Sequence, residues 1–327
     1  MIRVGTIGAG VIARMMAKTI HMMNEAGDNS VQMYGIASRS LEKAEAFAKE
    51  NGIPKAYGSY EEMASDPDIG LIYIATPHSH HYENVKMCIE HGKATLVEKA
   101  FTGNVRQARE LIALAEEKGV FITEAIWTRY QPMRRMIDET LASGIVGEPK
   151  MIAANRGQPL SQLDRIKKPE LAGGTLMDLG VYALNFTEMV FGHPQTVTAF
   201  GTKNELGADM NEVITLTFGD GKLASLWSSV EAVLDDDGVV WCTEGYIRVR
   251  NINNPEAMYI YNRDHQLIQT IEAPAKLTGY EYEVMEAAEA LRAGKTECAS
   301  MPHAETLHIM EVMDEIRRQL GVVYPFD

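Results

Sequence analysis

Ile-Arg-Val-Gly-Thr-Ile-Gly-Ala-Gly-Val-Ile-Ala, at residues 2–13, places a glycine-rich turn directly after an apolar strand and before a helical pattern. In that setting Gly8 allows the tight turn, Gly10 lets a pyrophosphate approach the backbone, and Ala13 keeps the helix close to the strand. We therefore predict a dinucleotide-binding unit of the Rossmann type. Its pyrophosphate-binding turn is predicted to consist of Gly8, Ala9, Gly10, Val11, Ile12 and Ala13.

Strand and helix patterns alternate from this turn to residue 124. Apolar runs predict strands at 2–7, 31–37, 70–75, 94–97 and 120–123, separated by helices that include 41–51, 79–91 and 104–118. Such alternation is typical of a parallel sheet with helices on both faces. The predicted fold class is α/β, with a doubly wound Rossmann domain over residues 1–124.

The alternation stops beyond residue 124. Helices are predicted at 132–142, 176–191, 280–293 and 304–320, and strands at 195–202, 211–218, 222–231, 239–250, 257–262 and 266–271. Gly219-Asp220-Gly221 predicts a hairpin turn. We expect residues 125–327 to form an α+β domain with a mostly antiparallel open sheet that binds substrate. Because such a sheet can leave one face for a partner, we expect a homodimer or higher homo-oligomer through it.

Composition excludes several classes of protein. The chain has 327 residues, more than one hydrophobic core usually supports, and 46% of them are hydrophobic, as in globular proteins. Its net charge of -14 opposes nucleic-acid binding and adsorption to anionic membranes. Three widely spaced cysteines give neither a disulfide framework nor a metal-ligand pattern. Since Met1 leads straight into the first strand, we expect no targeting peptide and a cytoplasmic protein.

The end of the second predicted strand indicates which nicotinamide cofactor is bound. NAD sites of this fold usually carry Asp or Glu there, on the ribose hydroxyls. This chain has Ser38 and Arg39, which can hydrogen-bond a 2′-phosphate, and Lys43 adds positive charge on the next helix. Arg39 and Lys43 are also compatible with a solvated surface pair. The missing carboxylate favours NADP over NAD.

Two segments follow strands at the edge of the sheet where ligands bind. One is Thr76-Pro77-His78-Ser79-His80-His81, and the other is Glu98-Lys99. Lys99 is therefore expected where the nicotinamide ring lies, although a loop lysine is more often paired with a carboxylate. The histidine run has no H-E-x-x-H motif and no cysteine partner, so we expect no metal site.

A third segment, Gly173-Gly174 followed by the helix at 176–191, carries a row of polar residues. Asp178, Tyr182 and Asn185 lie beside an apolar stripe, with Asp178 and Tyr182 one turn apart. Such a helix either lines a cleft or has one wet face. The spacing alone leaves both interpretations open.

Together these motifs resemble the glucose-fructose oxidoreductase, inositol dehydrogenase and MocA family. The resemblance is carried by the N-terminal fingerprint, Thr76-Pro77 with His81, Glu98-Lys99, and Gly173-Gly174 followed by Asp178 and Tyr182. Residues 54–62, 124–130 and 321–325 look like the branch of dihydrodiol dehydrogenases and NADP-dependent xylose dehydrogenases. This chain departs from the family in Ala100, where Pro is usual, and in His78, where Asn is usual.

The resemblance implies an NADP-dependent oxidoreductase that acts on a small molecule, a dihydrodiol or an aldose. Lys99 and Tyr182 would lie at the reacting carbon with Asp178 beside them, and either Lys99 or Tyr182 would exchange the proton. Thr76, Pro77, His81 and Glu98 would contact the cofactor. Trp127, Arg129 and Asn185 would bind substrate, although Trp127 also suits core packing. The alternative is a cofactor-binding sensor of the same fold without turnover.

Overall fold

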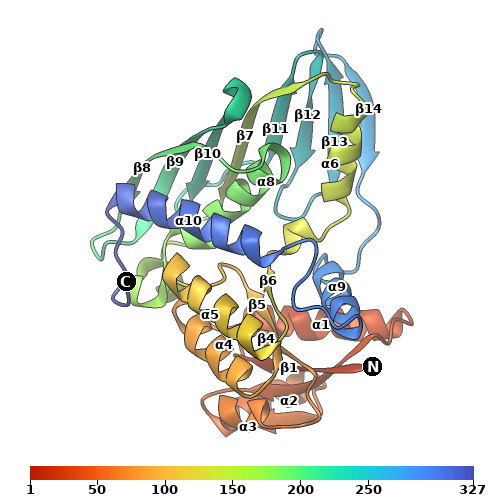
Figure 1. Ribbon diagram of the computed structural model, residues 1–327, viewed down its shortest axis with the longest axis vertical. Helices are drawn as coiled ribbons and strands as arrows, with labels where there is room; N and C mark the ends of the chain where they lie inside the picture. The colour runs from red at the N-terminus through yellow and green to blue at the C-terminus, as the bar shows by residue number, and fades with distance from the viewer. The chain divides into compact units, whose positions relative to one another are not determined.

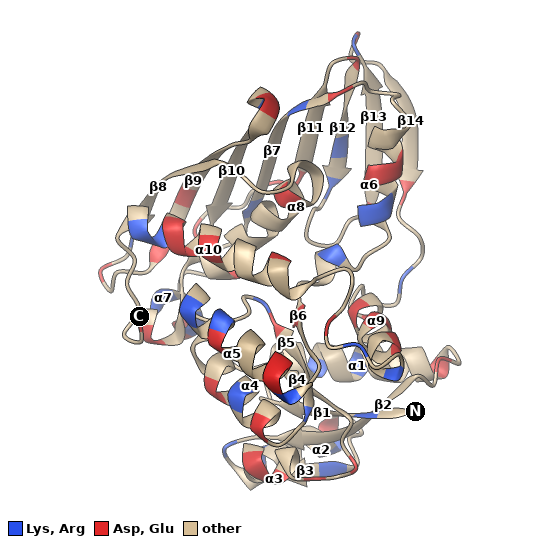
Figure 2. Cartoon of the chain, in the orientation of Figure 1, with Lys and Arg blue, Asp and Glu red and all other residues tan.

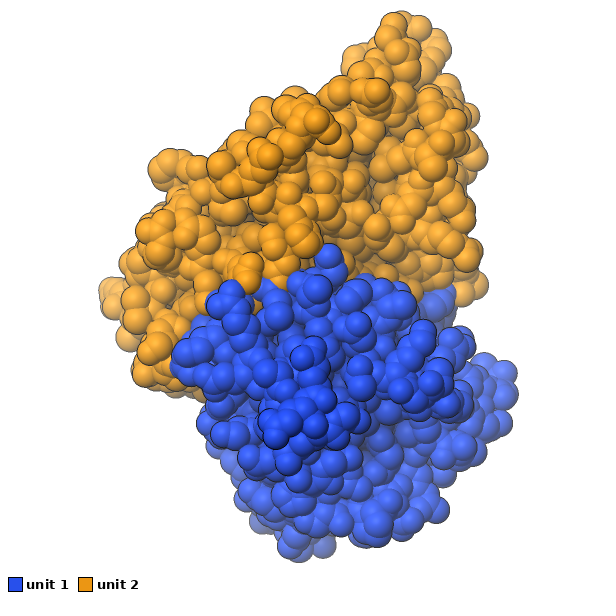
Figure 3. Space-filling view, in the orientation of Figure 1, with its two compact units in different colours: residues 1–127, 276–307 blue, residues 128–275, 308–327 orange.

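The computed structural model describes residues 1–327 (Figure 1). Residues 1–127 with 276–307 form one compact unit, and residues 128–275 with 308–327 form a second (Figure 3). The first unit therefore includes a late segment of the chain as well as the N-terminal alternation. The expected boundary after residue 124, with the functions assigned to its two sides, stays a prediction.

The first unit is built on a six-stranded parallel sheet. Its strand order is β3-β2-β1-β4-β5-β6, the order of a Rossmann fold. The strands are β1 Ile2–Ile7, β2 Val31–Ala37, β3 Lys55–Tyr57, β4 Leu71–Ile74, β5 Ala94–Glu98 and β6 Ile122–Ala125. The predicted doubly wound sheet is confirmed, and only the short edge strand β3 was not predicted.

Local sequence explains where the helices of this unit begin and end. Ser40, Ser59 and Asn104 each cap a helix by accepting a hydrogen bond from the backbone N–H three residues later. Gly119 ends α5 in the left-handed conformation at φ 64°. The helices are α1 Val11–Glu25, α2 Leu41–Glu50, α3 Tyr60–Ala64, α4 His81–Glu90, α5 Val105–Lys118 and α9 Glu281–Arg292.

The second unit is built on an eight-stranded mixed sheet in the order β14-β13-β12-β11-β7-β10-β9-β8. Its strands are β7 Pro149–Gly157, β8 Thr196–Lys203, β9 Asp209–Thr217, β10 Leu223–Ser229, β11 Gly238–Cys242, β12 Gly245–Arg250, β13 Ala257–Asn262 and β14 Leu267–Glu272. The mostly antiparallel sheet is confirmed. Two details of the prediction were wrong: central β7, which pairs in parallel with β10, was missed, and the strand expected at 239–250 is a hairpin of two.

One face of this sheet carries a helix that is buried on all sides. The chain enters it through a π-helical turn, Leu176–Gly180, and continues as α8, Val181–Phe191. Every residue from 176 to 188 is buried, because α8 packs against β7 and β10 on one side and α6, Met133–Ala142, on another. The interpretation with one wet face is therefore wrong for these residues. The remaining longer helix is α10, His303–Leu320, and short helical turns include α7, Asp164–Lys167.

Charge is spread over both units. Figure 2 shows Asp and Glu interspersed with Lys and Arg along the helices, while the strands of the second sheet are mostly uncharged. None of the helices combines the length and apolar character that crossing a bilayer requires.

Candidate active site

The turn between β1 and α1 has the backbone geometry that a bound pyrophosphate requires. Gly8 has φ +103°, and a Cβ there would lie 2.6 Å from the Ala75 carbonyl oxygen. A Cβ on Gly10 would meet no atom within 4 Å, which leaves open space at the start of α1. Ala13 is fully buried against the sheet. The residues present thus fit a phosphate group at a helix N-terminus.

The end of β2 carries positive charge and no carboxylate. Ser38 is half-buried, whereas Arg39 and Lys43 are exposed. Burial is the main cause that raises the pKa of Tyr60, and burial also lowers the pKa of His80; the charge of Arg39 lowers both. Tyr60 and His80 therefore lie near Arg39. Neither was predicted, because Tyr60 follows β3 and His80 follows β4, and only the strand order shows that β3 pairs with β2 while β2 and β4 flank β1.

His81 links the loops that follow β4 and β5. Its Nδ1 lies 2.9 Å from the Ala100 carbonyl oxygen and its Nε2 lies 2.8 Å from that of Thr76. Burial lowers the pKa of His81 to about 4, so the ring is neutral at physiological pH. Asn84, which sequence reasoning missed, donates to the Thr76 hydroxyl at 3.1 Å. This arrangement makes His81 a positioning residue, and the cofactor contacts predicted for Thr76, Pro77 and His81 stay predictions.

The main chain of Lys99 is held on both sides by neighbouring groups. Its N–H donates to Glu98 Oε2 at 3.2 Å, and its carbonyl oxygen lies 3.1 Å from His78 Nε2. Glu98 is itself buried and accepts a hydrogen bond from the Tyr73 hydroxyl. The Lys99-Ala100 peptide is cis. His78, at one of the two positions where the chain departs from the expected family pattern, thus contacts the backbone of the predicted catalytic residue.

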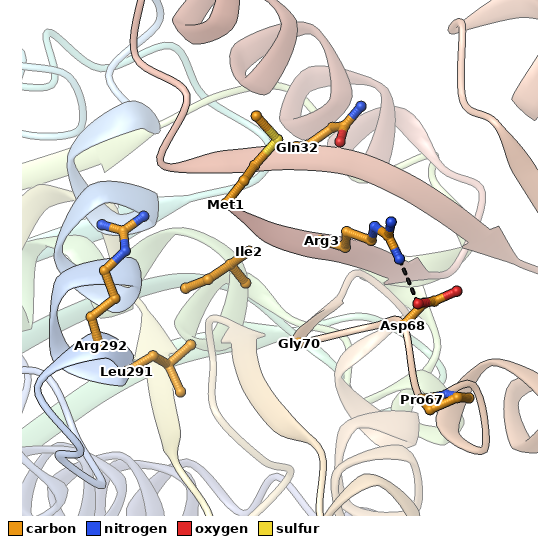
Figure 4. A pocket seen from close by; sticks show the side chains of 9 residues that line it. All are labelled: Met1, Ile2, Arg3, Gln32, Pro67, Asp68, Gly70, Leu291 and Arg292. Carbon is orange, nitrogen blue, oxygen red and sulfur yellow. Dashed lines mark ion pairs between the residues drawn. The ribbon is translucent and has the colours of Figure 1, made fainter.

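A pocket of about 570 Å³ lies at the opposite edge of the sheet (Figure 4). Met1 and Arg3 from the start of β1, Asp68 and Gly70 from the loop before β4, and Arg292 from α9 are among its lining residues. Arg3 is paired with Asp68. Ligands of open α/β sheets bind beyond the carboxyl ends of the strands, so this pocket is not the nucleotide site.

In the second unit, Asp178 lies on the π-helical turn and forms an ion pair with Arg165 from α7. The Asp178 side chain is 9% exposed and that of Arg165 is 45% exposed. The pair therefore places a cation beside a buried carboxylate, which lowers the cost of burying that charge. Arg165 was not predicted, because no motif marks the segment that contains it.

Two buried carboxyl groups on β9 pack against the π-helical turn. Asp209 accepts a hydrogen bond from the first N–H of the turn at 2.7 Å, and Glu212 accepts one from the Ser228 hydroxyl at 2.5 Å. Burial raises the pKa of Asp209, and burial together with the charge of Asp209 raises that of Glu212 well above its usual value. A Cβ on Gly174 or Gly180 would overlap these carboxyl groups. The two glycines are thus required by the close approach of the acids.

Two of the three predicted substrate-binding residues contact each other. Arg129 Nε donates to Asn185 Oδ1 at 2.5 Å, and the Asn185 amide donates to the Val181 carbonyl oxygen at 2.8 Å. Trp127 belongs to the first unit, where it stacks on Tyr280 with ring centroids 4.1 Å apart. Lys99 lies in the first unit, and Tyr182 is buried on α8 in the second. Their catalytic roles, like the substrate contacts, stay predictions.

Comparison with known proteins identifies both parts of the chain. Residues 2–125 match the model of an oxidoreductase family with an NAD-binding Rossmann fold, and residues 133–248 match the GFO/IDH/MocA C-terminal domain. The trans-1,2-dihydrobenzene-1,2-diol dehydrogenase of Bos taurus is 33% identical and covers 100% of this chain and 99% of its own. That of Xenopus laevis is 37% identical over 90% of this chain and 91% of its own.

Solved structures show the same fold at lower identity. A 3-ketoreductase from Actinomadura kijaniata, in complex with NADP and TDP-benzene, has a TM-score of 0.86 at 22% identity, covering 97% of both chains. An aldose-aldose oxidoreductase from Caulobacter crescentus has a TM-score of 0.85 at 20% identity, covering 98% of this chain and 97% of its own. The chain belongs to the GFO/IDH/MocA family of oxidoreductases, and it is an NAD(P)-dependent dehydrogenase that acts on CH–OH groups.

Proposed function

We propose that this enzyme uses NADP to oxidise a secondary alcohol or hemiacetal carbon of a dihydrodiol or aldose, or to catalyse the reverse reduction. The observation that carries the proposal is the similarity to trans-1,2-dihydrobenzene-1,2-diol dehydrogenases over the full length of the chain. Sugars stay among the candidates, because an aldose oxidoreductase shares the fold.

The choice of NADP over NAD is supported by the end of β2. An acidic residue there would bind ribose hydroxyls and repel a 2′-phosphate, and this chain has Ser38 and Arg39 instead. Arg39 can make a charge-assisted hydrogen bond to the phosphate. His80 and Tyr60 lie near Arg39 and offer polar groups to the same anion or a ring to the adenine.

The chemistry that we propose needs one acid-base group and one cation. NADP⁺, which the turn between β1 and α1 would hold, would supply the hydride acceptor when the substrate alcohol is oxidised to a carbonyl. Tyr182 accepts the hydroxyl proton, while the Lys99 ammonium holds the substrate oxygen. A tyrosine hydroxyl has a usual pKa of about 10, and each unit by which it is lowered requires about 1.4 kcal/mol of differential stabilisation. Lys99 supplies part of that stabilisation as a nearby positive charge.

Asp178 is proposed to position these groups rather than to exchange the proton. Its buried carboxylate forms an ion pair with Arg165, which fixes it on the π-helical turn. The negative charge of this carboxylate disfavours a phenolate on Tyr182. The positive charge of Lys99 has to offset that effect. In the alternative assignment, Lys99 exchanges the proton and Tyr182 holds the oxygen.

We also propose that the enzyme is a homodimer, or a higher homo-oligomer, formed through the open face of the second sheet. Directly paired residues share one face of a sheet, and the register places apolar side chains side by side across six strands. The row is Leu223, Met151, Trp241, Tyr246, Tyr261 and Leu267. Phe200, Val213 and Trp227 form a second row on the same face.

Such a continuous exposed apolar surface is typical of an interface. Phe200 is 72% exposed and Met151 is 50% exposed, although both lie in the middle of strands. A second copy of the same face would bury both rows, as two-fold symmetric contacts do. A cytoplasmic location stays a prediction.

The proposed activity is tested by an anaerobic assay of the purified chain with NADP⁺ or NAD⁺ against trans-dihydrodiols and aldoses. We expect reduction of NADP⁺ by at least one of them. Lys99→Ala and Tyr182→Phe should each lower kcat by about a hundredfold or more, a size usual for acid-base groups. NADP affinity, measured by fluorescence titration, should stay within a few-fold of the wild type.

The exposed Lys118→Ala and the half-buried Tyr34→Phe are matched controls that should keep full activity. Full activity in Lys99→Ala or Tyr182→Phe would remove that residue from the mechanism. Tight cofactor binding without reduction by any substrate in the panel would instead support a sensor. A pH-rate profile distinguishes the two proton acceptors, since only the variant that keeps the acceptor retains the loss of rate at low pH that protonation of the acceptor causes.

A further inference from the structure

A cluster of two histidines and one glutamate lies in the second unit, away from the predicted catalytic residues in sequence. Glu188 is on α8, His193 follows the end of that helix, and His308 is on α10. One ligand atom of each residue lies within 4.8 Å of the other two. We propose that these three residues bind a divalent transition-metal ion, with Zn²⁺ as the best match.

The donor set agrees with this assignment. Two imidazole nitrogens with one carboxylate oxygen form a donor set that suits Zn²⁺ and its neighbours, whereas Mg²⁺ and Ca²⁺ prefer oxygen ligands alone. His308 Nε2 and Glu188 Oε2 are 3.3 Å apart. Ligands about 2.0 Å from a tetrahedral ion lie about 3.3 Å from each other, so this pair already has the required separation.

Burial gives Glu188 a reason to bind a cation. Its side chain is fully buried, at 0% exposure, next to a His308 side chain that is 19% exposed. A carboxylate removed from water needs a positive partner, and a divalent ion supplies more charge than a protonated imidazole. The metal would replace the pairing between Glu188 and His308 with two stronger bonds.

His193 supplies the third ligand and the route of entry. It is exposed and stacks on His308, with ring centroids 3.6 Å apart and planes 10° apart. An imidazole nitrogen binds a metal ion in the plane of its ring, and two parallel stacked rings cannot both do so for one ion. His193 therefore has to turn about its side-chain bonds when the ion binds, which an exposed side chain does at little cost. A water molecule completes the coordination, while Glu311 lies on the side of the other ring nitrogen, 3.9 Å from His308 Nδ1.

The sequence does not reveal this cluster. Residue 308 lies 115 positions after His193, as counted along the chain, and no short ligand motif connects them. The three meet only because α10 passes beside the end of α8, the two helices that Figure 1 shows against the same sheet. The site is independent of the histidines at residues 78–81, where no metal is expected.

The test uses the full chain, stripped with a chelator and titrated with Zn²⁺ in competition with a chromophoric chelator. We expect one equivalent to bind, and the melting temperature to rise on saturation, since a ligand of the folded state stabilises it. Glu188→Gln, His193→Ala and His308→Ala should each weaken binding by at least tenfold. His265→Ala, in an exposed turn, is the matched control and should bind as the wild type does.

Glu188→Gln keeps the shape of the buried side chain, and His193→Ala changes only an exposed one, so both variants are expected to fold. Their melting temperatures without metal check this directly. Absence of stoichiometric binding would overturn the proposal, and so would equal affinity in the wild type and all three variants. The two histidines would then be an ordinary stacked ring pair, with His308 paired to Glu188.

Discussion

At the scale of single residues, cofactor choice depends on Arg39. It follows β2 at the carboxyl edge of the sheet, no acidic residue stands at that strand end, and its charge acts on both Tyr60 and His80. An exposed arginine is usually worth little to stability. Its effect should therefore appear in binding of the phosphate rather than in folding.

We expect Arg39→Asp to weaken NADP⁺ binding by about ten- to a hundredfold, because a charge-assisted hydrogen bond worth roughly 1.5–3 kcal/mol is lost and repulsion is added. NAD⁺ binding should change by less than about threefold. Both dissociation constants can be measured by fluorescence titration, with exposed Arg106→Asp on α5 as control. Equal losses for the two cofactors would contradict a role on the 2′-phosphate.

Sequence reasoning worked at this scale where a residue has a distinctive local setting. The glycine turn that contains Gly8 and the absence of an acid after β2 are visible in the printed chain. Arg165 is not, because its importance comes from Asp178, 13 residues later, after an irregular connection. Contacts of this kind depend on tertiary packing, which no local pattern encodes.

At the scale of elements, the π-helical turn and α8 form a buried helix that carries polar side chains. Its sequence predicts one polar row because Asp178, Tyr182 and Asn185 repeat on one side. The structure buries that row too, because polar partners such as Arg165 and Arg129 reach it. Strand β7 was missed because its apolar run is short: polar Asn155 and Arg156 end it, and Arg156 pairs with Asp236 from a segment far away in the sequence.

Glu212, which packs against the π-helical turn, is predicted to make the stability of the protein depend on pH. Its pKa in the folded state is raised well above the ordinary value of 4.5, so the folded protein holds a proton that the unfolded chain releases. The free energy of unfolding therefore falls as the pH rises above about 4.5, by up to about 1.4 kcal/mol per pH unit. Glu212→Gln cannot ionise and lacks this loss.

Urea unfolding of the wild type and Glu212→Gln at pH 5 and pH 8 measures the effect. The free energy of unfolding of Glu212→Gln, relative to that of the wild type, should be higher at pH 8 than at pH 5. Glu205→Gln, in an exposed turn, should show the same difference at both values. If Glu212→Gln also gives a pH-independent difference, Glu212 is not protonated in the folded state.

At the scale of the whole molecule, the alternation of strands and helices was enough to predict the Rossmann sheet, and the hairpin patterns predicted the class of the second sheet. The path of the chain between the two units was not predicted, since residues 276–307 return to the first unit. Helix patterns indicate that a helix forms there. They do not indicate which sheet it packs against, because that depends on which apolar surfaces remain uncovered.

The exposed rows on the second sheet give a prediction about assembly. Trp227 and Trp241 are 36% and 40% exposed on the inner strands β10 and β11 of the sheet, and aromatic side chains near the centre of an interface contribute most to it. Trp227→Glu and Trp241→Glu should each destabilise the assembly by about 2 kcal/mol or more, which is at least about thirtyfold in the dissociation constant. Sedimentation equilibrium should then show a monomer where the wild type is a dimer or larger. Val323→Glu, a 69% exposed apolar residue outside the rows, is the control and should leave the assembly intact. A wild type that is monomeric at micromolar concentration, or an assembly that both glutamate variants preserve, would show that this face is not the interface.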